Sequence, residues 1–245
     1  MNTKQIYLIF IKEFKSLILS PLAWSIMAIL QWVISFQFLA HIEKFLELQE
    51  QQGFSSNVTD TIIVPLYGAI AITLLLITPI LTMRQISGEF KNNTISLLLS
   101  SPTPISAIVL GKYFAVCLFL YLNIFLLSLM PISLILGASI DLAQIAAAII
   151  GVILCVSAFV ALGLYLSSLS HHPSIAAASS LGVLLFLWLI NWAAGSGEFS
   201  LLAYFSLLYH LKDFIMGSVS TEHIVYFILF IGYFLFLSIN KLRVH

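Results

Sequence analysis

Apolar and polar stretches alternate along the chain, and six of the apolar runs are long enough to cross a lipid bilayer. A hydrocarbon core of about 30 Å is spanned by about 20 helical residues. The uncharged runs that approach or exceed this length are Pro21–Ala40, Ile62–Met83, Tyr113–Leu136, Leu142–Leu169, Ser174–Ala194 and Ile224–Asn240. The pattern predicts an all-α polytopic membrane protein with six transmembrane helices, in which residues 1–245 form a single membrane domain.

Residues 199–216, within the external segment 195–222, form a further apolar stretch. If this stretch crossed the bilayer, Lys212 and Asp213 would be drawn toward the hydrocarbon, where a charge costs about 2.5–3.5 kcal/mol at mid-membrane. We therefore expect short re-entrant helices that dip into the outer leaflet before the sixth span. A helix that lies flat on the membrane surface is the alternative.

The N-terminal segment, residues 1–20, mixes basic and apolar positions and ends at Ser20-Pro21. Ile11, Phe14 and Ile18 recur at spacings of three and four residues, which is the period of one helix face. The pattern predicts a helix that lies in the cytoplasmic interface, with its lysine stems reaching the headgroups. A basic leader that only sets orientation is the alternative. The charged residues of this segment that we single out are Lys12, Glu13 and Lys15.

Composition and charge agree with a membrane location. Hydrophobic residues make up 61% of the chain and charged residues 8%, whereas soluble domains carry about 25% charged residues. The net charge of zero gives no indication of a nucleic-acid partner. Ten basic residues divide eight to two between the two sides of the predicted membrane, which puts both termini in the cytoplasm. The eight are Lys4, Lys12, Lys15, Arg84, Lys91, Lys112, Lys241 and Arg243, and the two are Lys44 and Lys212.

Motifs for catalysis are absent from the sequence. It contains no GxxxxGK[ST] phosphate loop, no HExxH zinc motif and no GxSxG nucleophile motif. No predicted span has a charged residue near its centre, which disfavours an ion-coupled transporter that works alone. Cys117 and Cys155 lie in apolar runs, and the adjacent His171 and His172 are more typical of a turn than of a metal site. We expect no cofactor in this chain and an energy source in a partner.

The cytoplasmic segment between the second and third spans, residues 84–112, is the most informative one. Asn92 or Asn93 can cap a short helix over 94–100, which the following prolines would end. Charges flank this helix, and a run of leucines on it could enter a groove of a soluble protein. The residues that we expect to couple this segment to a partner are Arg84, Glu89, Lys91, Thr94, Leu97, Leu98, Leu99 and Pro102.

This segment resembles the coupling-helix signature of ABC-2 type permeases, the membrane halves of ATP-binding-cassette exporters. The residues that carry the resemblance are Thr82-Met83-Arg84, Glu89, Lys91, Thr94, Leu97-Leu98-Leu99, Ser101-Pro102 and Gly111-Lys112. The start of the chain, Lys12-Glu13-Phe14-Lys15, and Ser167-Ser168-Leu169 resemble the gliding-motility-associated and nitrous-oxide-reductase-maturation branch. The chain departs from the family pattern at Gly88, Phe90, Asn93 and Ser96, which leaves fewer charges for contact with an ATPase.

The resemblance implies a permease subunit in the bacterial inner membrane that moves an unidentified substrate. Its expected partners are two copies of a separately encoded ABC ATPase, which would hold ATP and Mg²⁺, and a second permease copy in a homodimer or heterodimer. An accessory extracytoplasmic or membrane protein is left open as a further partner. The alternative function is a membrane anchor that transports nothing and serves an ATPase-driven motility or maturation complex.

Overall fold

The computed structural model describes residues 3–52, 58–92, 103–134, 140–194 and 204–243. These residues are almost entirely helical, and six of the helices are long and apolar enough to cross a membrane. The spanning helices are α2 (Pro21–Gln52), α3 (Val64–Thr82), α6 (Ile105–Ser133), α7 (Leu142–Leu169), α8 (Pro173–Ala194) and α11 (Thr221–Arg243). The shorter elements are α1 (Thr3–Ile18), the π-helical turn η1 (Thr59–Ile63), α4 (Ser87–Lys91) and α10 (Leu207–Ile215). The protein is therefore a polytopic α-helical membrane protein, as the sequence predicts.

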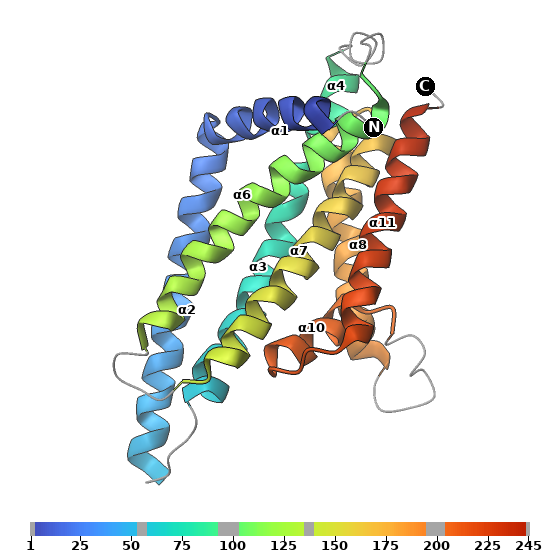
Figure 1. The fold of residues 1–245 in the computed structure, drawn as a ribbon. Coiled ribbons are helices and arrows are strands. Elements are labelled where there is room, and N and C mark those ends of the chain that lie inside the picture. The colour runs from blue at the N-terminus through green and yellow to red at the C-terminus, as the bar shows by residue number, and fades with distance from the viewer. Residues whose placement is uncertain (1–2, 53–57, 93–102, 135–139, 195–203, 244–245) are drawn as a thin grey trace.

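Helix α7 forms the centre of the bundle and contacts α3, α6, α8, α10 and α11 (Figure 1). In its most apolar 18-residue window 72% of the residues are buried, against 22% in the corresponding windows of α2, α8 and α11. Small residues on α7 permit this burial because they let the neighbouring backbones approach closely. The outer helices turn large apolar side chains outward, among them Trp32, Phe36, Phe186 and Phe236. These faces are suited to lipid or to another membrane protein.

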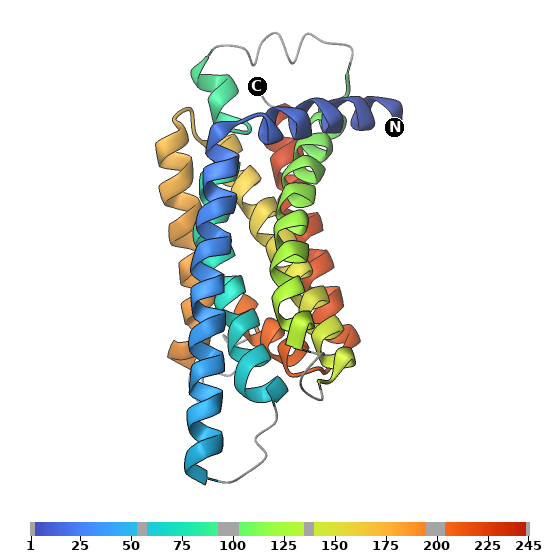
Figure 2. The same cartoon turned by 90° about the vertical axis from the view of Figure 1, so that its left-hand side faces the viewer.

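Helix α1 lies across one end of the bundle instead of running along it (Figures 1 and 2). The chain turns between α1 and α2 at Leu19 and Ser20, and the indole of Trp24 donates a hydrogen bond of 2.6 Å to the carbonyl of Ile18. Both described ends of the chain lie at this end of the bundle, together with α4 (Figure 1). We call it the α1 end. The crosswise position of α1 suits the interfacial role that the sequence predicts, which stays a prediction.

Several helices extend beyond the predicted spans. Helix α6 begins at Ile105 and not at Tyr113, because the charge of Lys112 is paired inside the protein and does not have to end the helix. Helix α2 continues to Gln52 through a polar segment outside the predicted span. Helix α11 runs to Arg243, and it has Glu222 in its first turn and two basic residues in its last, an arrangement that favours both helix ends.

The described part of the segment 195–222 contains one short helix, α10, at the end of the bundle opposite the α1 end (Figure 1). Its nine residues are far fewer than the about 20 that a crossing requires. Residues 195–203 lie outside the described residues. Whether α10 dips into the outer leaflet or lies flat at its surface stays a prediction.

The contact between α3 and α7 depends on a glycine. A Cβ atom on Gly163 of α7 would overlap the side chain of Thr82 on α3, whereas a Cβ atom on Gly182 of α8 would meet no atom within 4 Å. We expect Gly163→Ala to destabilise the protein by about 1–3 kcal/mol through overpacking. Thermal unfolding in detergent would measure this effect as a lower midpoint.

Gly182→Ala is the matched control, because the same change in a helix without a close neighbour should leave the unfolding midpoint equal or slightly raised. Equal midpoints for the two variants would contradict the close approach of α3 and α7.

Candidate coupling site

The candidate site lies at the α1 end, where α1, α4 and the start of α6 meet. Its centre is Lys112 in the third turn of α6, whose side chain is only 3% exposed. The Lys112 ammonium nitrogen lies 3.1 Å from Oε1 of Glu13 on α1 and 2.8 Å from Oε1 of Glu89 on α4. A single buried cation thus joins three helices that are far apart in sequence.

The two carboxylates make the burial of Lys112 possible. Removing a charged group from water costs several kcal/mol unless paired groups compensate for the lost hydration. Glu13 and Glu89 are 18% and 21% exposed, so each keeps partial contact with water while it faces the ammonium group. The arrangement places one positive and two negative charges in a small volume, and it fixes α1 and α4 relative to α6.

The glycine before Lys112 lets α1 approach closely enough for this contact. A Cβ atom at Gly111 would lie 2.7 Å from Cγ2 of Ile9 and 3.2 Å from the backbone nitrogen of Phe10. Real Cβ atoms essentially never lie closer than 3.0 Å to such an atom, so a residue with a Cβ atom would force α1 or Ile9 to shift where α1 crosses α6. The pair Gly111-Lys112 thus supplies both the close approach and the charge that holds it.

A second polar contact holds the start of α4 on the central helix. The hydroxyl of Ser167, near the end of α7, accepts hydrogen bonds from the backbone N–H groups of Ile86 (3.2 Å) and Ser87 (3.0 Å). The same hydroxyl donates to the carbonyl of Met83 at 3.1 Å. Because Ser167 is fully buried, its three bonds fix the turn between α3 and α4 on α7.

A polar cleft of about 720 Å³ opens between these elements. Arg84 and Lys91 are exposed on it, and Glu13, Glu89 and Lys112 line its wall. Gln85 also lines the cleft; its side chain is buried, and its Oε1 has no hydrogen-bond partner among the described residues. The cleft therefore presents charged and polar groups at the end of the bundle where α4 begins.

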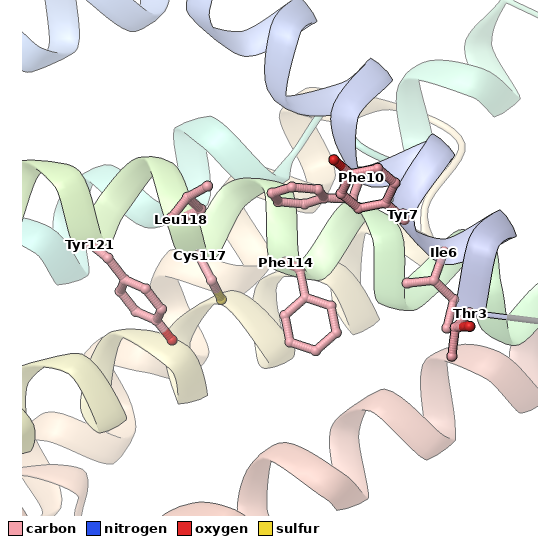
Figure 3. A pocket seen from close by; sticks show the side chains of 8 residues that line it. All are labelled: Thr3, Ile6, Tyr7, Phe10, Phe114, Cys117, Leu118 and Tyr121. Carbon is pink, nitrogen blue, oxygen red and sulfur yellow. The ribbon is translucent and has the colours of Figure 1, made fainter.

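A second recess, of about 400 Å³, lies between α1 and α6 and has a different character (Figure 3). Its walls are mostly aromatic and aliphatic, with Tyr7 and Phe10 from α1 and Phe114 and Tyr121 from α6. It contains no charged side chain. The candidate site is therefore the polar cleft and not this recess.

Comparison with known families decides which family the chain belongs to. A family model described as ABC-2 family transporter protein matches residues 7–238, which include most of α1, the polar cleft and most of α11. The chain belongs to the ABC-2 transporter family. It is a permease of this family, a multi-pass membrane subunit of an ABC transporter. No curated protein matches the chain. The narrower resemblance to the gliding-motility and nitrous-oxide-reductase-maturation branch stays a prediction.

The structure brings together only some of the residues that the sequence singles out in this permease. Glu13 and Glu89 meet at Lys112, and Arg84 and Lys91 are exposed at the cleft. Lys12 and Lys15 are exposed on α1. The remaining predicted coupling residues lie outside the described residues: Thr94, Leu97, Leu98, Leu99 and Pro102.

The structure adds details that sequence reasoning missed. A short helix, α4, begins at Ser87, and Asn92 lies at its C-terminal end, whereas the sequence indicated only a helix that starts after Asn92 or Asn93. Lys112 and Ser167 belong to the motifs of the resemblance, but their sequence positions do not indicate the contacts that they make. The signal that could have identified Lys112 is a charged residue next to a glycine at the start of an otherwise apolar run.

Loss of the buried cation should destabilise the permease. We expect Lys112→Met to cost about 3 kcal/mol, the lower end of the range for breaking a buried pair, because both carboxylates keep some contact with water. Chemical or thermal unfolding of the purified chain would measure this loss.

Lys91→Met is the matched control, since Lys91 is exposed and a surface substitution usually changes stability by less than about 0.5 kcal/mol. Similar stabilities for the two variants would contradict the role of Lys112 as a structural tie.

Proposed function

We propose that this chain is the transmembrane permease subunit of an ABC transporter in the bacterial inner membrane, and that it couples ATP hydrolysis by a separate ATPase to the movement of an unidentified substrate. Membership of the ABC-2 family supports this proposal. So does the sequence, which contains no phosphate-binding loop of its own. The observation that carries the coupling part is the contact of Lys112 with both Glu13 and Glu89.

The α1 end faces the cytoplasm in this proposal. Arg84, Lys91, Lys112 and the basic residues of α1 lie on the predicted cytoplasmic side, and the eight-to-two division of lysine and arginine favours this orientation. Segment 84–112 would then be the cytoplasmic coupling segment and residues 1–20 an interfacial helix. The segment 195–222, with α10, would face the other side.

The contacts at the polar cleft offer a route for a mechanical signal. Closure of the ATPase dimer would push on the segment after α4, which includes the predicted docking residues Thr94, Leu97–Leu99 and Pro102. Movement of α4 would pass to α6 and α1 through Glu89 and Lys112, and to α7 through the turn bonded to Ser167. Since α7 contacts most of the other spanning helices, this route reaches the whole bundle.

The proposed complex contains two ATPase subunits, each with bound ATP and Mg²⁺, and two permease copies as a homodimer or heterodimer. The exposed aromatic side chains on α2, α8 and α11 supply apolar faces for lipid or for the second permease. An accessory protein on the membrane or extracytoplasmic side would be a further partner.

Orientation can be tested with single cysteines and a membrane-impermeant maleimide. Both native cysteines are buried and so give little background. In intact spheroplasts, we expect Ser218→Cys after α10 to be labelled and Lys91→Cys to react only after permeabilisation. The opposite labelling pattern would reject a cytoplasmic α1 end.

Docking and transmission can be separated in nanodiscs that contain the permease and its ATPase. We expect Leu98→Arg to reduce ATPase copurification at least about tenfold, since a buried charge without a partner costs more than 1.4 kcal/mol. In contrast, Glu89→Gln keeps the exposed surface nearly unchanged but weakens the tie to Lys112. It should retain the ATPase and lower its stimulation by the permease severalfold.

Leu8→Arg is the control for Leu98→Arg, because Leu8 is an exposed apolar residue on α1. Unchanged copurification with Leu98→Arg, or unchanged stimulation with Glu89→Gln, would contradict the docking and transmission parts respectively. If the wild-type complex assembles and hydrolyses ATP but no candidate substrate moves in proteoliposomes, the alternative of an anchor that transports nothing is favoured.

A further inference from the structure

Two histidines and an aspartate form a hydrogen-bonded chain at the end opposite the α1 end. His210 of α10 and His223 of α11 are 2% and 5% exposed. Their Nδ1 atoms lie 2.7 Å apart, which requires a shared proton between them. Nε2 of His223 lies 2.6 Å from Oδ2 of Asp213, and Nε2 of His210 lies 2.9 Å from the carbonyl oxygen of Tyr204.

The three contacts fix the number of protons in this chain of groups. The Tyr204 carbonyl can only accept, so Nε2 of His210 carries a proton. One proton lies in the contact between the Nδ1 atoms, and one lies between His223 and Asp213. Three hydrogen bonds need three protons, whereas two neutral imidazoles and a carboxylate supply only two. The arrangement therefore holds one excess proton, whichever group carries it.

The surroundings favour a single excess proton over two. Burial lowers the pKa of His210, and the neighbouring His223 acts in the same direction, while the Tyr204 carbonyl, Glu222 and Asp213 oppose this shift. Protonation of both rings would also leave two donors facing each other at the Nδ1 contact. The carboxylate of Asp213 lies next to His223, so the positive charge is best compensated on that ring.

Other ionisable groups on the elements around the pair are few. Helix α8 has none in its sequence, α3 has Tyr67, and the described ionisable residues of α7 are Cys155 and Tyr165. Helix α6, which also contacts α11, has Lys112, Tyr113, Cys117 and Tyr121. Cys155 is buried, and Tyr165 packs against Phe234 farther along α11. The groups on α10 and α11 themselves, and on the segment before α10, are Tyr204, Tyr209, Lys212, Asp213, Glu222 and Tyr226.

Helix α10 packs against two helices. The histidine contact and an aromatic stack join it to α11, and Phe214 places it against α7. The ring of His210 stacks on Tyr226 with centroids 3.8 Å apart, and the Tyr226 hydroxyl donates to the carbonyl of Phe205 at 2.9 Å. Phe214 of α10 lies against Gly151 of α7, where a Cβ atom would overlap it. The contacts of His223 with His210 and Asp213 are thus hydrogen bonds that join α10 to α11.

We propose that His210, His223 and Asp213 form a proton-binding site that holds α10 against α11 when one excess proton is bound. This site is independent of the proposed coupling site and of which side of the membrane it faces. Its consequence is a pH-controlled release of α10 from α11, at the end opposite the polar cleft.

The sign of the pH dependence follows from the proton count. Released α10 would leave two histidines with ordinary pKa values of about 6.5, so the released state binds on average one proton near that pH. Above pH 6.5 the released state binds fewer protons than the docked state, and below pH 6.5 the released state binds more protons than the docked state. Rising pH and falling pH therefore both favour release. Docking should be strongest near pH 6.5, weaker by about 25-fold at pH 8.5 and by about eightfold at pH 5.0.

Hydrogen exchange of the full chain in nanodiscs tests this prediction. Protection of the α10 peptides, corrected for the intrinsic pH dependence of exchange, should follow a bell-shaped curve with its maximum near pH 6.5. His223→Gln leaves His210 as the one titrating ring of the site and needs no excess proton, so protection should no longer fall above pH 6.5 and should fall only at lower pH. His172→Gln is the matched control, because His172 is exposed in the turn before α8 and should leave the curve unchanged.

The proposal would be overturned if protection of the α10 peptides in the wild-type chain is constant or changes in one direction with pH. It would also be overturned if the bell-shaped pH dependence is retained in His223→Gln. If His223→Gln does not fold, nitrogen-15 spectra of histidine-labelled wild-type protein decide the question. At pH 7.5 one ring should be protonated on both nitrogens and share a proton with a second ring, whereas the spectrum of only neutral rings would reject the site.

Discussion

A single buried ammonium group constrains the α1 end of this permease. Lys112 can be buried only where two carboxylates reach it, and those carboxylates come from α1 and α4. The position of α1 across the bundle, the start of α6 and the position of α4 therefore depend on one another. Gly111 is part of the same constraint, because any side chain there would push α1 away from α6.

The two ends of the bundle are closed by polar contacts of different chemistry. Lys112, Glu13 and Glu89 form a contact between one ammonium group and two carboxylates. The histidine pair at the opposite end depends on one exchangeable proton. Helix α7 contacts both regions, with Ser167 near α4 and Gly151 against α10. This common helix offers a physical connection between the proposed ATPase-docking end and the conformation of α10 at the other end.

The sequence predicts the spanning helices well because long uncharged runs leave few alternatives in a membrane. It does not predict their ends, as α6 illustrates: Lys112 looks like the boundary of a span until its partners in α1 and α4 are known. Glu13 and Glu89 could be singled out from the family resemblance, but their contact joins residues far apart in sequence. His210 and His223 carry no recognisable spacing, so only the fold reveals that they meet. The predicted docking residues Leu97–Leu99 lie outside the described residues and stay a prediction.

The central claim is that Lys112 and Glu89 act as a unit that transmits force from α4 to α6. A double-mutant cycle tests it most directly, with Glu89→Gln, Lys112→Met and the double variant compared by their stimulation of the partner ATPase in nanodiscs. The account predicts strongly non-additive effects, with the double variant little worse than the more impaired single variant. If the loss of ATPase stimulation in the double variant equals the product of the losses in the two single variants, the result would contradict transmission through this contact.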